Sequence, residues 1–372
     1  MSETNTIRLN KVLFTSDLHD PARSTSRMKK KASPPRRLIT SVYHESSSLS
    51  PKQNLAAPAS KFSVVSMFSG CGGMDLGFQG GFTVLGHEYD RLPFAVIWAN
   101  EHNPDACRTY RKNLGVEIKC DDVWASMDSM PIETDVLIGG FPCQDVSVNG
   151  KRAGINGART GLYRAMIEGI KRTHPKIFVA ENVRGLLMKD KGASIRQVVS
   201  DFEELGYKVT YELHDAANFG VPQTRERVII IGIADKNRKF KYPKPVLRKE
   251  TWITAKTALA DLEAVEENPR INHIWSRANK SGEQGNRRLV ADRPGYTIRA
   301  ECHGNIQYHY SLKRRISMRE AARIQSFPDS FIFDAKLRET ERQIGNAVPP
   351  VFAWHVAKAV EKYLKGEEQL NS

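Results

Sequence analysis

Residues 139–150, GGFPCQDVSVNG, place a cysteine directly after a proline at the end of an apolar run. The run, residues 135–138, predicts a buried strand, and the two glycines after it predict its end. Cys143 could serve there as a nucleophile, because a thiolate reacts near neutral pH and also leaves readily. The alternative interpretation is a small apolar side chain packed under a turn. These residues alone leave both interpretations open.

Two further stretches carry polar side chains where strands should end. FVAENVRG presents Glu181 and Asn182, and VPQTRERVII presents Gln223, Arg225 and Arg227. A thiol, an acid and two cations at the carboxyl ends of strands predict a reactive site. Structural ion pairing is the alternative for the two arginines.

A glycine-rich loop follows the first apolar run, in VVSMFSGCGGMDLGF. Gly70, Gly72 and Gly73 lie between a predicted strand and helix, where open α/β sheets bind ligands. A dinucleotide fingerprint would need glycine at position 75, which is Asp75. The loop therefore favours a nucleoside without phosphates, such as S-adenosylmethionine.

An acidic residue, Glu101, ends the run FAVIWA and its continuation. Acids at the end of the second strand commonly bind ribose hydroxyls in nucleoside-binding α/β folds. Capping of the following helix is the alternative.

The elements that must position these residues alternate along the chain. Strands are predicted at 62–68, 82–89, 134–140, 175–182, 207–213 and 227–234, and amphipathic helices at 103–115, 162–174, 193–206 and 349–364. This alternation predicts an α/β, doubly wound, largely parallel sheet. After about Tyr242 it stops, and residues 245–340 are polar, rich in arginine and asparagine, and irregular.

The composition of the chain is basic. Of 372 residues, 56 are Lys or Arg and 42 are Asp or Glu, a net charge of +14. Residues 1–60 hold 10 basic and 4 acidic residues in a Ser/Pro-rich sequence that predicts disorder. The remaining chain still carries +8, which favours a polyanionic partner such as nucleic acid.

The cysteines and the hydropathy pattern indicate which bound metals, disulfides and cellular compartment to expect. The five scattered cysteines show neither a disulfide framework nor metal-ligand spacing, so no metal is predicted. No apolar stretch is long enough to cross a membrane, and a reducing cytoplasm is expected.

Six motifs in this order carry a family resemblance: FSGCGG, GGFPCQ, ENVRG, QTRERV, SMREAARIQSFPD and IGNAVPP. Over roughly residues 62–362 the sequence resembles the DNA (cytosine-5)-methyltransferases. The resemblance implies a Rossmann-like sheet that uses S-adenosylmethionine. It also implies a catalytic domain at 61–244, completed by 340–366, and a target-recognition domain at 245–339, after the tail at 1–60.

The resemblance implies a role for each motif. Cys143 would add to cytosine carbon 6, Glu181 would share a proton with the ring, and Asn182 would order the cysteine loop. Arg225 and Arg227 would bind the flipped nucleotide or hold the closed loop.

On the cofactor side the implied residues share one pocket, with Glu101 on the ribose and Asp121, or its neighbour Asp122, near the adenine amine. His102 would stack on adenine, and Asn346 would close the pocket. The full implied set is Phe68, Gly70, Gly72, Gly73, Glu101, His102, Asp121, Pro142 and Asn346.

For DNA, the loop after the cysteine is rich in small and cationic residues and is expected to close over the duplex. The expected DNA contacts are Gln144, Ser147, Lys151, Gln223 and Arg299. The target base lies inside the duplex and would have to be flipped out.

The sequence thus predicts a monomeric, cytoplasmic, nucleoid-associated enzyme that methylates carbon 5 of cytosine in double-stranded DNA. It would be the modification half of a restriction system, with a cognate endonuclease encoded nearby. A tRNA cytosine methyltransferase is the rival enzyme, against which the long basic recognition segment argues. A catalytically dead DNA-binding relative is the rival from another class, which the intact motifs disfavour.

Overall fold

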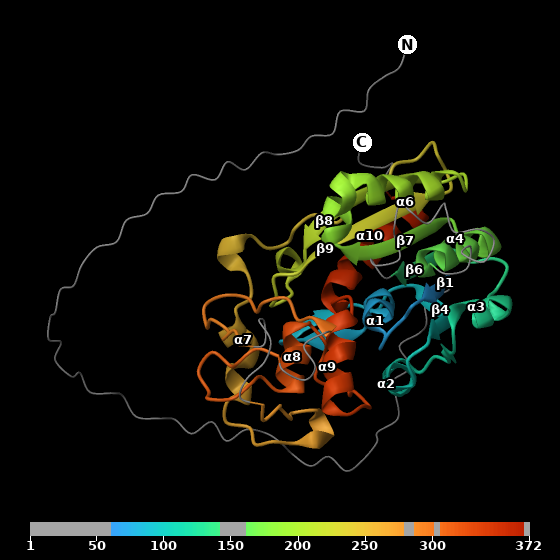
Figure 1. Cartoon of the computed structure of the whole chain (residues 1–372). Coiled ribbons are helices and arrows are strands. Elements are labelled where there is room, and N and C mark those ends of the chain that lie inside the picture. Colours follow the sequence, from blue (N-terminus) through green and yellow to red (C-terminus); the bar gives the residue numbers. More distant parts are fainter. Residues whose placement is uncertain (1–60, 142–160, 279–285, 301–305, 368–372) are drawn as a thin grey trace, which may run out of the picture. The chain divides into compact units, whose positions relative to one another are not determined.

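A computed structural model describes residues 61–141, 161–278, 286–300 and 306–367 (Figure 1). Its centre is a seven-stranded sheet in the order β5-β4-β1-β6-β7-β9-β8. The strands are β1 (Phe62–Met67), β4 (Phe94–Glu101), β5 (Lys119–Cys120), β6 (Val136–Gly140), β7 (Ile177–Val183), β8 (Lys208–Asp215) and β9 (Glu226–Ile233). Strands β5, β4, β1, β6 and β7 pair in parallel, and β9 runs antiparallel to both of its neighbours. The predicted doubly wound, largely parallel sheet is confirmed.

Both faces of this sheet are buried, which explains why its strands are continuous apolar runs. Successive residues of β1 point to opposite faces, so Val64 and Val65 belong to two different core clusters. One face packs against α1 (Gly73–Gln79), α2 (Pro104–Leu114) and α10 (Pro350–Lys365). The other packs against α3 (Val123–Ser126), α4 (Leu162–Thr173), α5 (Gly185–Met188) and α6 (Ala193–Glu203).

One predicted strand, residues 82–89, is wrong. The structure forms two short antiparallel strands there, β2 (Phe82–Val84) and β3 (His87–Tyr89), which pair with each other and not with the main sheet. Leu85 and Gly86 both have positive φ, 50° and 79°, as a two-residue hairpin turn requires. The glycine therefore marks a reversal of the chain.

The chain order reverses at β1, which fixes where a ligand should bind. Residues after β1 build the side with β4 and β5, and the chain then crosses to build β6 and β7 on the other side. Open α/β sheets bind ligands beyond the carboxyl ends of the strands at such a switch point. The glycine loop between β1 and α1 lies at this point.

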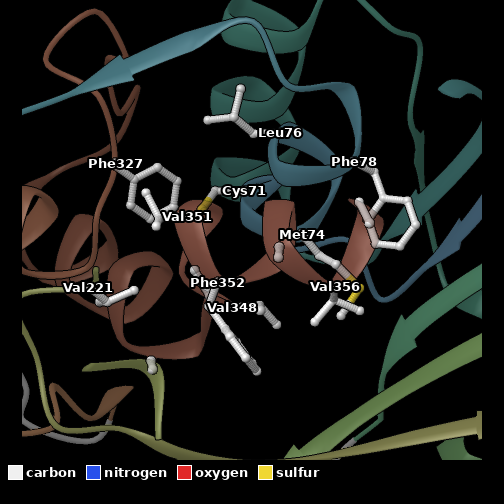
Figure 2. Packing of buried hydrophobic residues seen from close by; sticks show 14 of the residues in the cluster. Cys71, Met74, Leu76, Phe78, Val221, Phe327, Val348, Val351, Phe352 and Val356 are labelled. Atoms are coloured by element: carbon white, nitrogen blue, oxygen red, sulfur yellow. The ribbon is translucent and has the colours of Figure 1, made fainter. Parts of the chain in front are cut away.

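The C-terminal helix returns to the start of the fold, because α1 packs along α10. Figure 2 shows Cys71 and Met74 among Val348, Val351, Phe352 and Val356, which all belong to one buried cluster. A Cβ at Gly77 would overlap Ala353, so glycine lets the two helices approach closely. The predicted helix at 349–364 is thereby confirmed as part of the sheet's covering layer.

Residues 245–339 are irregular, as expected, but they do not form a core of their own within the described part. They contain α7 (Ala255–Leu259), α8 (Met318–Ile324), the start of α9 (Leu337–Asn346) and 3₁₀ turns at Lys249–Thr251, Ala260–Leu262 and Pro269–Ile271. Leu259, Ile298 and Phe327 share one buried cluster with α1 and α10. This segment is therefore anchored on the same core as the sheet.

Candidate cofactor and catalytic site

Glu101 links the end of β4 to the glycine loop. Its Oε2 accepts the Gly70 amide at 3.0 Å, and its Oε1 accepts the Asn103 amide at 2.8 Å and lies 3.0 Å from Nδ1 of His102. Burial opposes ionisation, but these donors outweigh it and hold the pKa of Glu101 below its ordinary value. The carboxylate is thus ionised and fixed at the switch point.

Capping of the helix that follows β4, which was the alternative role for Glu101, is carried out by another residue. Asn103 is the N-cap of α2, where its Oδ1 accepts the amides of Asp105 and Ala106. The His102 ring is 71% exposed beside Glu101, which leaves its face accessible for stacking.

The three glycines of the loop differ in what they do. Gly70 has φ +57° and open space where a Cβ would stand, whereas Gly72 and Gly73 are buried against protein. A side chain at Gly72 would meet Tyr110 and Leu114, and one at Gly73 would overlap the Val348 carbonyl. The expected direct cofactor role fits the open Gly70, while Gly72 and Gly73 are needed for close packing.

The loop's hydrogen bonds agree with a ligand that lacks phosphates. The Gly70 amide is taken by Glu101 and the Gly72 amide by the Ser69 carbonyl at 2.9 Å. A phosphate-binding loop would instead offer such amides to the ligand. Phe68, half-buried with φ +55°, stands at the end of β1 where the loop begins.

Asp121 and Asp122 follow the end of β5. Asp122 is the N-cap of α3 and accepts the Trp124 amide at 2.8 Å. Asp121 is exposed, and Asn100 anchors its carbonyl at 2.9 Å. Asp121 Oδ1 likewise accepts a backbone amide, that of Asp122 at 2.8 Å, and both aspartates are exposed, so these contacts do not favour one of them as the ligand contact. The sequence reasoning missed Asn100, although a polar residue inside an apolar strand was a usable signal.

Asn346 ends α9 between two anchored carbonyls. Arg225 Nη2 donates to the carbonyls of Gly345 at 2.7 Å and Ala347 at 3.0 Å. Ala347 and Val348 in turn pack on Gly73. The motif IGNAVPP thus returns to the glycine loop, and Asn346 is exposed beside it.

Glu181 and Arg227 form a buried ion pair across β7 and β9. Arg227 Nε lies 2.7 Å from Glu181 Oε1, and both side chains are about one-tenth exposed. Burial lowers the pKa of Arg227, and the Glu181 carboxylate opposes that shift. A Cβ at Gly140 would lie 3.2 Å from Glu181 Oε2, so the end of β6 runs directly beside this carboxylate.

Asn182 holds the exit of β6. Its Nδ2 donates to the Phe141 carbonyl at 2.9 Å, and its Oδ1 accepts the Val183 amide. Phe141 is the last described residue before the predicted nucleophile, two positions further on. The predicted residues Pro142, Cys143, Gln144, Ser147 and Lys151 lie outside the described residues.

Two residues of the QTRER motif do not reach an open site. Arg225 is fully buried and donates to the carbonyls of Ile298, Gly345 and Ala347. Gln223 is also fully buried; its Oε1 accepts the Ile298 amide at 3.0 Å and its Nε2 meets Gln325. The expected DNA contact of Gln223 does not fit this burial.

Arg299, by contrast, is exposed on the segment of chain that Gln223 and Arg225 anchor.

In the described residues no group of three or more His, Cys, Asp or Glu side chains is placed to hold a metal ion. None of the described helices is long and apolar enough to cross a membrane.

The carboxylates at the switch point and the buried acid beside β6 form the arrangement expected of an α/β enzyme with a ligand site at the ends of its strands. The profile of the C-5 cytosine-specific DNA methylase family matches residues 62–289 and 270–362. The chain belongs to this family and is a DNA cytosine methyltransferase.

Curated relatives agree with this assignment, and a solved structure agrees with the fold. The Type II methyltransferase M.NgoFVII of Neisseria gonorrhoeae is 35% identical over 342 residues, covering 82% of this chain and 88% of its own. M.FnuDI of Fusobacterium nucleatum is 33% identical, covering 82% and 96%. A prophage-encoded DNA modification methyltransferase from E. coli shares the fold, with TM-score 0.59, 21% identity and coverage of 82% and 100%.

Proposed function

We propose that the protein transfers a methyl group from S-adenosylmethionine to carbon 5 of cytosine in a specific sequence of duplex DNA, as the modification enzyme of a Type II restriction system. The observation that carries the proposal is that the proposed cofactor and catalytic residues lie at the ends of neighbouring strands of the sheet. Gly70, Glu101 and Asp121 line one side of the switch point, and Glu181 with Arg227 lies at the end of β7 on the other.

The residues of the first side fit the cofactor. Glu101 would accept the ribose hydroxyls, Asp121 the adenine amine, and Asn346 would close the pocket from α9. Phe68 and His102 would flank the adenine. The bound cofactor supplies an activated methyl group.

The residues of the second side fit the chemistry on the base. The Cys143 thiolate would add to carbon 6 of a flipped-out cytosine, which makes carbon 5 a nucleophile toward the methyl group. Loss of the proton from carbon 5 and departure of the thiolate would then restore the ring. Glu181, held in one orientation by Arg227, would share a proton with ring nitrogen 3 during the addition.

The remaining residues would position these groups. Asn182 would hold the strand exit that leads to Cys143, and Arg225 would tie the catalytic strand β9 to the segment carrying Asn346. Arg299 and the loop residues Gln144, Ser147 and Lys151 would contact DNA. The domain limits 61–244 with 340–366, and 245–339, remain our assignment.

The names of the relatives support a role in a restriction-modification system. Several are Type II methyltransferases, so we expect a cytoplasmic, monomeric enzyme with a cognate endonuclease encoded nearby. Bisulfite sequencing of a bacterial genome that expresses the protein tests the proposal. One short sequence should be protected at a single cytosine, and protection should vanish in Cys143→Ala. Protection of tRNA with unmodified genomic DNA would contradict the proposal.

A further inference from the structure

A buried hydrogen bond joins α1 to α2 directly beneath the glycine loop. The Tyr110 hydroxyl donates to Asp75 Oδ1 at 2.8 Å, and both side chains are fully buried. Asp75 Oδ2 has no hydrogen-bond partner among the described residues. Burial raises the pKa of Asp75 to about 6, although the Tyr110 hydroxyl lowers it. None of the catalytic roles above uses this pair.

The same tyrosine also presses on the loop itself. A Cβ built on Gly72 would lie 2.9 Å from Cδ2 of the Tyr110 ring, and it would overlap Leu114 of the same helix. Gly72, at φ +94°, is the N-cap of α1. Tyr110 therefore touches the α1 end of the loop at two points, with its ring on Gly72 and its hydroxyl on Asp75.

The first turn of α2 is fixed to the other side of the cofactor site. Cys107, one turn before Tyr110, contacts the Glu101 carbonyl through Sγ at 3.2 Å. The Asn103 amide, at the N-cap of α2, donates to the Glu101 carboxylate at 2.8 Å. Helix α2 is thus a rigid connection from Glu101 to the glycine loop.

We infer that Tyr110 and Asp75 are a positioning pair, which sets the separation of the glycine loop from Glu101 and so the affinity for S-adenosylmethionine. The inference rests on the proposed cofactor site. Neither residue touches the cofactor; the pair acts through Gly72 and through the Gly70–Glu101 hydrogen bond. A change in this pair should therefore alter the affinity for the cofactor and leave the rate of methyl transfer nearly unchanged.

The test compares purified full-length variants by calorimetric titration with S-adenosylmethionine, thermal unfolding and steady-state kinetics. Tyr110→Phe should weaken cofactor binding about five- to tenfold, because a buried acceptor loses its donor. The KM for the cofactor should rise equally, and kcat at saturating cofactor should stay within about twofold. Asp75→Asn keeps an acceptor for the hydroxyl and should bind nearly as the wild type does.

A matched control separates positioning from general stability. Tyr207 is another buried tyrosine, whose hydroxyl donates to the Pro175 carbonyl at 2.8 Å away from the loop. Tyr207→Phe should lower the melting temperature without changing cofactor affinity. If Tyr110→Phe behaved in the same way, or if Asp75→Asn lost as much affinity as Tyr110→Phe, the inference would be overturned.

A further variant distinguishes failure of the inference from failure of the proposed site. Glu101→Ala should abolish measurable cofactor binding. If it does so while Tyr110→Phe binds normally, only the positioning role is lost; if Glu101→Ala binds normally, the site itself is misplaced. Should Tyr110→Phe not fold, Asp75→Ser, which shortens the acceptor beyond the reach of the hydroxyl, provides the same comparison.

Discussion

Two buried carboxylates near the glycine loop show how donors decide the state of an acid. Three donors surround Glu101 and hold its pKa down despite burial. At Asp75 burial outweighs the hydroxyls of Tyr110 and Ser66, which lower the pKa, and raises it to about 6. The two residues lie on either side of one loop, so the difference comes from hydrogen bonding and not from depth alone.

This difference predicts a pH-dependent stability. Because the folded-state pKa of Asp75 is raised, the folded protein binds the proton more tightly, and this group's contribution to stability falls as pH rises from about 4 to 6. Asp75→Asn should remove that loss and raise the free energy of unfolding at pH 8 by about 1–3 kcal/mol. Urea unfolding at several pH values checks it. A difference from wild type that is the same at pH 4 and pH 8 would contradict the assignment.

The structure allows a specific test of the expectation that Asn346 closes the cofactor pocket. Its flanking carbonyls are fixed by Arg225, and its neighbours pack on Gly73. Asn346→Ala should therefore raise the KM for S-adenosylmethionine more than it lowers DNA affinity. Cofactor titration decides the matter: a folded variant with unchanged cofactor affinity would remove Asn346 from the site.

At the scale of elements, the glycine loop is held by helices that are distant in sequence. Gly73 is packed by the turn between α9 and α10, and Gly72 by α2. The loop thus depends on the C-terminal helices for its shape as much as on β1.

Gly73→Ala and Gly70→Ala should separate these two kinds of glycine. At Gly73 the new methyl group overlaps main-chain oxygen, so we expect a loss of about 2–3 kcal/mol in the free energy of unfolding. At Gly70 there is space, and only the positive φ costs about 1 kcal/mol. Chemical denaturation of the two variants measures both losses, and equal losses would argue against the packing role of Gly73.

The sequence was sufficient for most strands of the main sheet, but not for the short strand β5, for the hairpin at 82–89 or for the partners of the side chains. Continuous apolar runs such as Val136–Ile138 identify buried strands, and Glu181 lies near the carboxyl end of one, as expected. Arg227 was expected at the carboxyl end of a strand but lies at the start of β9; it meets Glu181 because β9 runs antiparallel to β7. The hairpin at 82–89 was missed because its turn, Leu85 and Gly86, begins with an apolar residue that continues the preceding apolar run. The contacts of Arg225 lie 73 to 122 residues away along the chain, and only the folded topology brings those carbonyls to it.

At the scale of the whole molecule, positive charge is spread over the chain. Residues 1–60 contribute +6 of the net +14, and the rest carries +8. All residues that the family profile matches lie after position 61. A general attraction to DNA is therefore expected from both parts, and sequence recognition from the second alone.

Deleting residues 1–55 tests this division. The methylated sequence should stay the same, because no motif of the family lies in the deleted part. Nonspecific DNA affinity should fall and its dependence on salt should become shallower, since fewer cations contact phosphates. Binding measured at several salt concentrations, with bisulfite mapping, checks both points; a changed target sequence or a chain that no longer folds would contradict them.

The central claim is that Cys143 forms a covalent bond to cytosine while Glu181 assists. DNA that carries 5-fluorocytosine at the target measures it directly, because fluorine cannot leave as a proton and the adduct is trapped. Wild type should give a denaturation-resistant protein–DNA band, Glu181→Gln the same band formed ~10²–10⁴ times more slowly, and Cys143→Ala none. A trapped band with Cys143→Ala would show that another residue is the nucleophile.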